Sequence, residues 1–347
     1  MLLWGIWILA VIIASFSVAI MACLVLVRIA TDILRRRRAA RRTAVLDHVF
    51  AWLEGGISDE EAEQVFRESR AVSTGLLIEI FELMRGEDQR RLADLAERAG
   101  VPQYLRDSIE VGNAAERLTA AESLVWFPSP ETLAVLRFAL HDRDDQVALA
   151  AAASLAELGE DLPVARLLEA RLGHLGDSSK RLEAVLIRIA PRQVDDLLSV
   201  AQDSIAPDRV RAAAIDALSR TGLFELMAPI AALADAPSPI VRASVARSLG
   251  ILGHPGAYDA IVRLLGDSSW EVRAEAAEAT GKIGLDDAAQ LLADLLNDDN
   301  WWVRFRAGEA LASLGETGIA RLRMIAQSRK DVSRRMAALV LAERGLV

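Results

Sequence analysis

Residues 270–284 read Trp-Glu-Val-Arg-Ala-Glu-Ala-Ala-Glu-Ala-Thr-Gly-Lys-Ile-Gly, and this stretch decides the fold. Small and apolar side chains recur in it at intervals of three and four residues, which places them on one face of a helix. These positions are Val272, Ala276, Ala279, Thr280 and Ile283. Gly284 follows them, where a left-handed residue ends a helix at little cost. The stretch therefore predicts an amphipathic helix that stops at a glycine.

The same pattern recurs along the chain with a constant 31-residue period. Val-Arg pairs stand at 210–211, 241–242, 272–273 and 303–304, and each is followed at the same interval by a glycine, at 222, 253, 284 and 315. Less regular copies occupy residues 115–125, 147–159, 180–186 and 332–345. A second amphipathic stretch, such as 288–296, and an Asp/Asn-rich turn, such as 297–300, complete a unit. Because a pair of short helices cannot bury its own apolar face, neighbouring units must stack into a solenoid.

This pattern resembles HEAT repeats, in the short form also found in phycobilisome-lyase-like proteins. The matching features are the turn aspartate, the Val-Arg pair, the Ala-rich helix and the closing glycine, and they cover residues 113–347. The resemblance implies a right-handed superhelix with the Val-Arg helices on its concave side. The predicted fold class is all-α: an α-solenoid of about eight HEAT-like helix-pair repeats, preceded by an irregular helical segment and one transmembrane helix.

Aspartates and arginines recur around the turns. Asp267 precedes Arg273 by six residues, and Asp298 precedes Arg304 by six. In the HEAT family such pairs form a ladder between turns and adjacent helices, so the resemblance implies a structural role for them. The corresponding arginines of two earlier units are Arg211 and Arg242. The alternative is a basic stripe that binds acidic ligands, although the nearby acids would cancel its field.

The first residues have a different character. Residues 2–27 contain no charged side chain, and as a helix they would span about 39 Å, enough to cross a bilayer core of about 30 Å. We therefore expect a transmembrane helix at residues 1–30. Because arginines follow the span, the N-terminus is expected outside and the solenoid in the cytoplasm of a single-pass protein in a bacterial-type inner (plasma) membrane. An alternative is processing as a lipoprotein, since residues 20–23 loosely resemble a cleavage box.

The arginines form a basic juxtamembrane collar at residues 31–42. Its members are Arg35, Arg36, Arg37, Arg38, Arg41 and Arg42. Residues 1–42 carry seven Arg and one Asp, a net charge of +6, so the rest of the chain carries −9 − 6 = −15. The collar either determines topology alone or also contacts anionic lipid at the membrane surface. The acidic body argues against nucleic-acid binding.

Residues 43–112 are helical in pattern but lie off the 31-residue rhythm. Ser58-Asp59-Glu60-Glu61 is typical of a capping box that opens a helix. Since a solenoid needs an atypical unit at its end, we interpret this segment as an irregular helical cap. The alternative is a separate docking domain.

The composition and motifs exclude most kinds of catalytic site. One cysteine excludes a disulfide framework and a cysteine-based zinc site, and the four histidines are scattered. The sequence contains neither a phosphate-binding glycine loop nor a nucleophile elbow. Paired carboxylates, at 195–196 and 286–287, stand near helix starts, where they favour capping. We therefore expect no catalytic residue, no metal, no cofactor and no enzymatic activity.

The aromatic residues are unevenly placed. Trp270 and Trp301 lie one period apart, and Trp302 and Phe305 extend the cluster, which Arg306 adjoins. The positions equivalent to Phe305 in three other units hold alanine, so packing alone does not require a ring there. Trp and Arg dominate protein–protein hot spots, which favours a partner-binding patch. The alternative is that the rings seal the turn ridge against the next repeat.

Together these features predict a scaffold that binds partner proteins at the cytoplasmic face of the membrane. Such a protein would be an accessory subunit of a membrane complex, with polysaccharide export or secretion as examples, and its partners would themselves be membrane-associated. The resemblance to phycobilisome-lyase-like repeats implies an alternative, a bilin-lyase-like protein that handles a chromophore.

Overall fold

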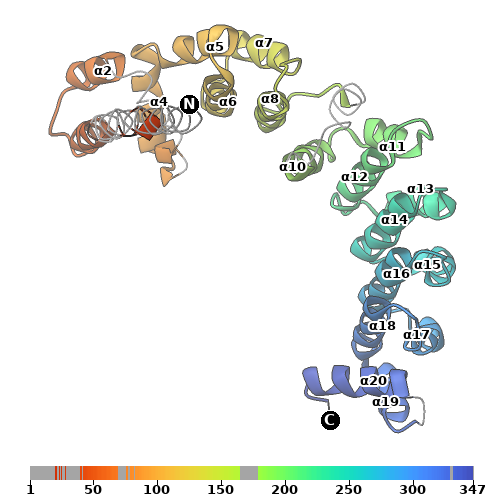
Figure 1. The fold of residues 1–347 in the computed structure, drawn as a ribbon. Coiled ribbons are helices and arrows are strands. Elements are labelled where there is room, and N and C mark those ends of the chain that lie inside the picture. The colour runs from red at the N-terminus through yellow and green to blue at the C-terminus, as the bar shows by residue number, and fades with distance from the viewer. Residues whose placement is uncertain are drawn as a thin grey trace, which may run out of the picture. The chain divides into compact units, whose positions relative to one another are not determined.

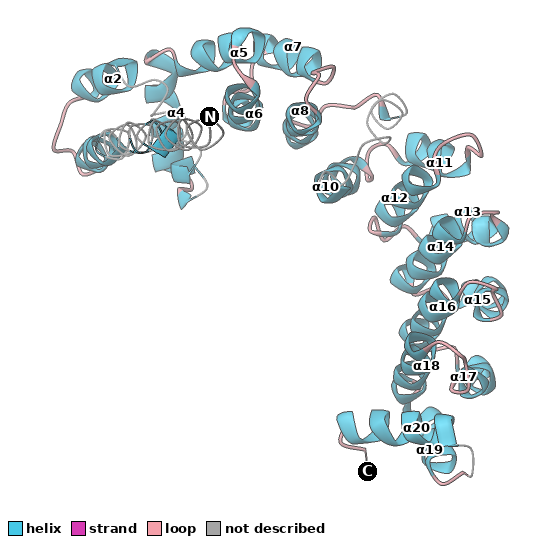
Figure 2. Cartoon of the chain, viewed as in Figure 1, coloured by secondary structure: helices cyan, strands magenta, loops and turns pink. Residues whose placement is uncertain are grey.

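The structure is a computed structural model that describes residues 42–68, 79–81, 83–164, 179–328 and 331–346, together with residues 20, 21, 23, 25, 28, 40 and 76. Throughout these described residues the regular elements are helices, with no strand (Figure 2). The chain divides into two compact units, residues 1–139 and residues 140–347. The predicted all-α class is confirmed for the described part of the chain.

In the first unit, five α-helices and one 3₁₀ turn have both of their ends among the described residues. They are α2 (Asp59–Glu68), α4 (Glu87–Arg98), α5 (Val101–Val111), α6 (Ala114–Ser123), η1 (Leu124–Trp126) and α7 (Pro130–Ala139). The predicted capping box is present at the start of α2: the Ser58 amide donates to Glu61 Oε2, and the Glu61 amide donates to Ser58 Oγ, both at 3.3 Å. A second capping box, between Asn113 and Glu116, opens α6.

The core of the first unit is built around aromatic rings. Phe81 stacks on Trp126 with ring centroids 5.2 Å apart, and it meets Phe127 edge-on. Trp52 is buried, and its indole N–H donates to Asp59 Oδ1 at 2.8 Å. Buried Trp and Tyr groups are normally satisfied by such a partner. Phe81, Phe127 and Trp52 therefore serve packing.

The second unit is a stack of helix pairs. Its described α-helices are α8 (Asp145–Glu157), α10 (Ser179–Ile189), α11 (Val194–Gln202), α12 (Asp208–Ser219), α13 (Met227–Ala231), α14 (Pro239–Leu252), α15 (Tyr258–Leu265), α16 (Trp270–Ile283), α17 (Ala289–Leu295), α18 (Trp301–Ser313), α19 (Gly315–Ala326) and α20 (Asp331–Glu343). The Val-Arg helices α12, α14, α16 and α18 pack against one another in a row, and α11, α13, α15 and α17 form a second row beside it (Figure 1). The predicted solenoid is confirmed for this unit.

The 31-residue rhythm corresponds to helix ends. Gly222, Gly253, Gly284 and Gly315 all have positive φ, between 65° and 79°. A side chain is disfavoured in that region, and glycine tolerates it. Each of these glycines therefore follows a Val-Arg helix and lets the chain turn into the next pair, as the sequence predicted.

Two helix-interior glycines let the Val-Arg helices approach closely. A Cβ added at Gly250 would lie 2.9 Å from the Ala279 Cα, and one at Gly281 would lie 2.8 Å from the Ala310 Cα. The two glycines occupy equivalent positions in successive repeats, so the same contact recurs between α14 and α16 and between α16 and α18. Neither position has room for a side chain, so the backbones of neighbouring Val-Arg helices approach each other closely at these two points.

The predicted membrane localisation is corrected. Among the described residues, no helix is long and apolar enough to cross a bilayer. Helices such as α14 and α16 have 14 residues each, whereas a spanning helix needs about 20. The segment that carried the prediction, residues 1–30, lies outside the described residues apart from single positions, and so does most of the collar at 31–42. Arg42, which is described, forms an ion pair with Glu79.

Candidate partner-binding face

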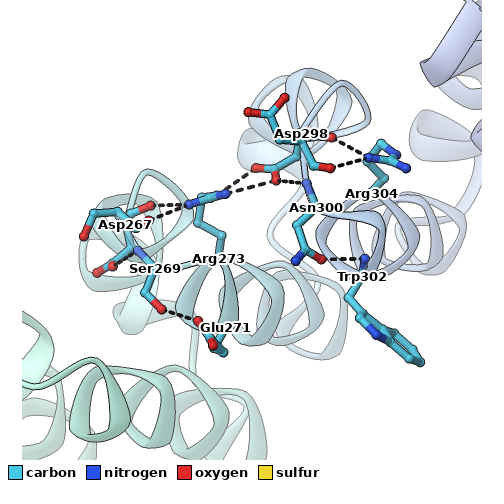
Figure 3. Close-up of polar contacts among 10 residues, drawn as sticks. Asp267, Ser269, Glu271, Arg273, Asp298, Asn300, Trp302 and Arg304 are labelled. Atoms are coloured by element: carbon cyan, nitrogen blue, oxygen red, sulfur yellow. Dashed lines mark hydrogen bonds and ion pairs between the residues drawn. The ribbon is translucent and has the colours of Figure 1, made fainter.

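A ladder of ion pairs joins the turns of successive repeats (Figure 3). Arg273 reaches Asp298 of the next repeat, with Nε 2.7 Å from Oδ2 and Nη2 3.0 Å from Oδ1. Its remaining nitrogen, Nη1, donates to the carbonyl oxygen of Asp267 at 2.7 Å. Arg242 binds Asp267 in the same bidentate way, at 2.7 and 2.8 Å. Each arginine therefore holds its own turn through a carbonyl and the following turn through a carboxylate.

These pairs are shielded, and the pKa values of the acids reflect it. The Asp267 and Asp298 side chains are 9% and 7% exposed. The hydrogen bond from Arg242 lowers the pKa of Asp267 against the opposing effect of burial. Burial is the largest single effect on Asp298 and would by itself raise its pKa. The hydrogen bonds from Arg273 and from the Asn300 amide together outweigh burial, so the pKa of Asp298 is lowered. Both acids are therefore held ionised.

The ladder changes at its two outer arginines. Arg211 is buried and donates from Nε to the Ala201 carbonyl at 3.1 Å, because the position equivalent to Asp267 is Ala236. Arg304 holds its own turn through Nη1, at 2.7 Å from the Asp298 carbonyl. Its Nε is buried without a hydrogen-bond partner. The ladder therefore has two carboxylate rungs, the ion pairs Arg242–Asp267 and Arg273–Asp298, and they join the repeats of α14, α16 and α18.

The ladder also positions the aromatic cluster at the start of α18. Asp298 Oδ1 accepts from the Asn300 amide, and Asn300 Oδ1 accepts from the Trp302 amide, both at 2.8 Å. Asn300 is therefore the N-cap of α18, and Trp302 projects away from the ladder (Figure 3). Trp301 stacks on Phe305 at 5.1 Å, and Trp302 meets Trp301 edge-on at 4.9 Å. The rings support one another in a fixed arrangement.

The two tryptophans at the start of α18 nevertheless remain accessible. Trp301 is 44% exposed, Trp302 is 51% exposed, and Phe305 is half-buried. Trp270, one repeat earlier at the start of α16, is 39% exposed. A rigid and exposed aromatic surface of this kind is typical of binding sites, because large rings lose little side-chain entropy on contact.

Arg306 is engaged by the protein itself. Its Nη1 lies 2.6 Å from Glu278 Oε2 of the preceding repeat. We call the surface formed by the row α12, α14, α16 and α18 the Val-Arg face. A second set of cross-repeat ion pairs lies on it, and its members at equivalent positions are Asp216, Arg247, Glu278 and Glu309.

Arg247 shows how this second set works. It bridges Asp216 at 3.0 Å and Glu275 at 3.1 Å, and so it joins the repeats before and after its own. The Val-Arg face therefore carries its own line of salt bridges, separate from the ladder at the turns. We call this line the face network.

A groove of about 450 Å³ lies on the same face. Its floor includes Ala212, Ala243 and Ser244, and the position equivalent to the two alanines on α18 is Phe305. Asp216 lines the groove and accepts from Ser244 Oγ at 2.7 Å. Burial raises the pKa of Asp216, partly offset by Arg247. Small side chains thus open the groove over α12 and α14, and large rings fill the corresponding space on α18.

The sequence did not single out this groove or the face network. The signal was present in the residues at the equivalent positions of four successive repeats, which are three acids and one arginine: Asp216, Arg247, Glu278 and Glu309. Ile240, at the start of α14, was also missed, and it is 48% exposed. Within the described residues, no group of three or more His, Cys, Asp or Glu side chains could hold a metal ion.

Residues 226–312 match the family model for HEAT repeats. This stretch is similar to HEAT repeats. The match runs over the helix pairs from α13 to α18, and so it includes the two carboxylate rungs of the ladder and the aromatic cluster. The resemblance inferred from the sequence is confirmed for these pairs. No curated protein matches the chain.

Several solved structures resemble the chain in fold. One is Kap121p bound to Pho4p, at 13% identity and a TM-score of 0.47, over 87% of this chain and 43% of Kap121p. Another is an engineered protein, at 17% identity and a TM-score of 0.37, over 86% of this chain and 98% of that one. A third is the complex of CpcE and CpcF of phycocyanin lyase from Nostoc, at 20% identity and a TM-score of 0.35, over 62% and 77%.

Proposed function

We propose that the chain is a non-enzymatic scaffold that binds a partner protein through the Val-Arg face of its last HEAT repeats. The observation that carries the proposal is the pair Trp301 and Trp302, fixed by stacking and capping yet about half exposed. Solenoids bind partners through extended preformed surfaces, and tryptophans dominate the binding energy of such contacts. The chain would then act as an accessory subunit that holds its partner along the stack of repeats.

Two features favour binding over chemistry. The charged groups of the face network are paired with one another across repeats, which supports the shape of the face and leaves little for proton transfer. The rings, in contrast, stack on one another and stay partly exposed at the start of α18. We therefore assign specificity to the aromatic residues and rigidity to the ion pairs. The chromophore-handling alternative has no separate observation in its favour and remains a prediction.

The test is capture of partners by the full chain and by a Trp301→Ala, Trp302→Ala double variant. Phe138→Ala serves as the matched control, because Phe138 is an exposed ring, at 68%, outside the face. We expect one protein to be retained by the wild type and by Phe138→Ala and lost from the double variant. Direct titration of that purified protein should then show a loss of at least about tenfold in affinity. Equal retention by the double variant contradicts the proposal.

A further inference from the structure

Exposed apolar side chains stand at the N-terminal ends of three successive Val-Arg helices. Ile240 lies at the start of α14, Trp270 at the start of α16, and Trp301 and Trp302 at the start of α18. Their exposed fractions lie between 39% and 51%. We call these four residues the rim. In the 31-residue register Trp270 is equivalent to Trp301, and Ile240 is equivalent to Trp302. The rim therefore has two columns of equivalent positions, and each column has a rim residue on two of the three helices.

The repeat distance of the rim limits what can lie along it. Neighbouring helices in proteins pack about 8–10 Å apart, and Gly250 and Gly281 let these helices reach close contact. A polyproline II helix has three residues per turn and rises about 3.1 Å per residue, so the same face returns about every 9.3 Å. In a β-strand, residues three apart point to opposite faces. An α-helix is about 10–12 Å wide and would need a groove, and the lining of the groove on the Val-Arg face includes Ile240 but none of the three tryptophans of the rim.

The charge around the rim selects a basic occupant. Two exposed acids stand next to the tryptophans in the sequence. Glu271 directly follows Trp270, and Asp299 stands two residues before Trp301. Of the nearby cations, Arg306 is paired with Glu278, whereas Arg304 binds two turn carbonyls, which do not neutralise its charge. The chain beyond residue 42 carries a net charge of −15, from −9 − 6. A positively charged segment is therefore attracted both locally and by the whole body.

We propose that the rim binds a basic, proline-rich segment of a partner protein in the polyproline II conformation. Prolines three residues apart would lie on Trp270 and on Trp301, and a lysine or arginine between them would face Glu271. Aromatic residues are the usual platform for polyproline II ligands, whose preformed helix loses little entropy on binding. This inference rests on the proposed function and adds the chemistry of the partner.

The test is a fluorescence anisotropy titration of the full chain with a labelled peptide of repeated Pro-Pro-Lys. About 12 residues, or about 37 Å, would span three repeats. A Gly-Ser-Lys peptide of equal length keeps the charge without the conformation, and a Pro-Pro-Glu peptide keeps the conformation with the opposite charge. We expect the Pro-Pro-Lys peptide to bind at least about tenfold more tightly than either control, which equals about 1.4 kcal/mol.

Two variants locate the binding. Trp270→Ala should weaken binding of the Pro-Pro-Lys peptide by about tenfold, which a loss of about 1.4 kcal/mol per stacked ring would produce. Glu271→Lys should weaken the same peptide and tighten the Pro-Pro-Glu peptide, an effect that unfolding cannot imitate. Phe138→Ala should bind like the wild type. Thermal unfolding of each variant establishes that it is folded.

The inference is overturned if the Gly-Ser-Lys peptide binds as tightly as the Pro-Pro-Lys peptide, or if Trp270→Ala leaves binding unchanged. The two proposals fail separately. If the captured partner depends on Trp301 and Trp302 while the Pro-Pro-Lys peptide does not bind, only the proline-rich assignment is lost. If capture is independent of Trp301 and Trp302, the proposed function itself is lost.

Discussion

Arg273 and Asp298 belong to successive HEAT repeats and meet in a bidentate ion pair, at 2.7 and 3.0 Å. Asp298 also receives the Asn300 amide, and Asn300 caps the helix that begins with the two exposed tryptophans. One carboxylate therefore fixes the spacing of two repeats and the start of the aromatic cluster. The stability of the stack and the geometry of the aromatic cluster are therefore linked at this residue.

The first prediction concerns this carboxylate. Asp298→Ala removes both bonds from Arg273, whose side chain is only 18% exposed, and leaves a shielded guanidinium without its counter-charge. We expect the free energy of unfolding to fall by about 3 kcal/mol, as for other half-broken shielded pairs. Urea unfolding followed by circular dichroism measures the change.

The matched control is Asp299→Ala. Asp299 is exposed, and its carbonyl oxygen accepts from Arg304, so this variant removes an equal charge while the backbone acceptor stays. Surface substitutions of this kind change stability by about 0.5 kcal/mol or less. If both variants lose the same stability, the ion pair is not the cause.

The second prediction is the acid sensitivity of the ladder. The pKa values of Asp267 and Asp298 are lowered in the folded chain, so their contribution is complete above the unfolded value of about 3.9 and is lost as the pH falls through the folded value. The free energy of unfolding should therefore drop as the pH falls below about 4. In an Asp267→Asn, Asp298→Asn variant this drop should be smaller, which urea titrations at several pH values will show. An equally steep drop in the variant would place the acid sensitivity elsewhere.

The third prediction has the opposite sign. Burial raises the pKa of Asp216, so the stability linked to this group is fully present below about pH 3.9 and is lost as the pH rises through the folded value. Asp216→Asn keeps an acceptor for Ser244 and abolishes this titration. Relative to wild type, the variant should gain stability as the pH rises from about 3.5 to 7.

In the wild type the ion pair of Arg247 with Asp216 forms only when Asp216 is ionised, so its effect is already part of the Asp216 pKa. The slope of the difference between variant and wild type against pH therefore decides. Arg247 retains its bond to Glu275 at 3.1 Å. A difference between variant and wild type that stays constant over this pH range would show that burial does not control the Asp216 carboxyl.

The helix pairs could be predicted from the sequence because one physical constraint recurs in every repeat. Gly284 must adopt a positive φ to end α16, and no other residue does so without strain. Val272 must face the core, where it is fully buried. Since such constraints act locally, the pattern of a single unit reveals the unit's fold and the repeat reveals the stack.

The partners within the ladder could not be read from spacing alone. Asp267 stands six residues before Arg273 and 25 residues after Arg242, and these distances sum to the period of 31. A periodic sequence cannot say which arginine receives the carboxylate. The structure shows that Arg242 does, whereas Arg273 takes only the Asp267 carbonyl.

The aromatic cluster shows a related limit. The excess of rings at α18 was visible in the sequence, but the engagement of Arg306 by Glu278 depends on how α16 and α18 face each other. These two side chains belong to different repeats and meet only because their helices pack together. Exposure of Trp301 and Trp302 likewise depends on what the last helices cover.

The fourth prediction concerns Gln193, a buried side chain that satisfies both backbone groups of Leu162 in place of a backbone partner. Its Nε2 donates to the Leu162 carbonyl at 2.8 Å, and its Oε1 accepts from the Leu162 amide at 2.9 Å. Gln193→Ala leaves both backbone groups unsatisfied and should cost about 2–3 kcal/mol. The control is Gln202→Ala, at the exposed far end of α11, which should have little effect on thermal unfolding. Similar melting of the two variants would contradict this role.

The last prediction weighs two opposing effects at Gly281. Alanine is favoured over glycine inside a helix by about 1 kcal/mol. At Gly281, however, the new Cβ would lie 2.8 Å from the Ala310 Cα and 3.0 Å from its Cβ, and a backbone atom cannot move aside as a flexible side chain can. Overpacking costs about 1–3 kcal/mol, and the gain of about 1 kcal/mol from helix propensity offsets part of it. Gly281→Ala should therefore lower the free energy of unfolding by up to about 2 kcal/mol.

Ala312 occupies the position equivalent to Gly281 in the next repeat, which makes Ala312→Gly the matched control. It should lose about 1 kcal/mol through helix propensity alone. Combining Gly281→Ala with Ala310→Gly removes the Cβ that the new methyl group meets, but the close Ala310 Cα remains in place, so we expect only partial recovery. If Gly281→Ala instead raises the unfolding temperature, helix propensity outweighs packing, and the close approach of α16 and α18 is not a constraint on the fold.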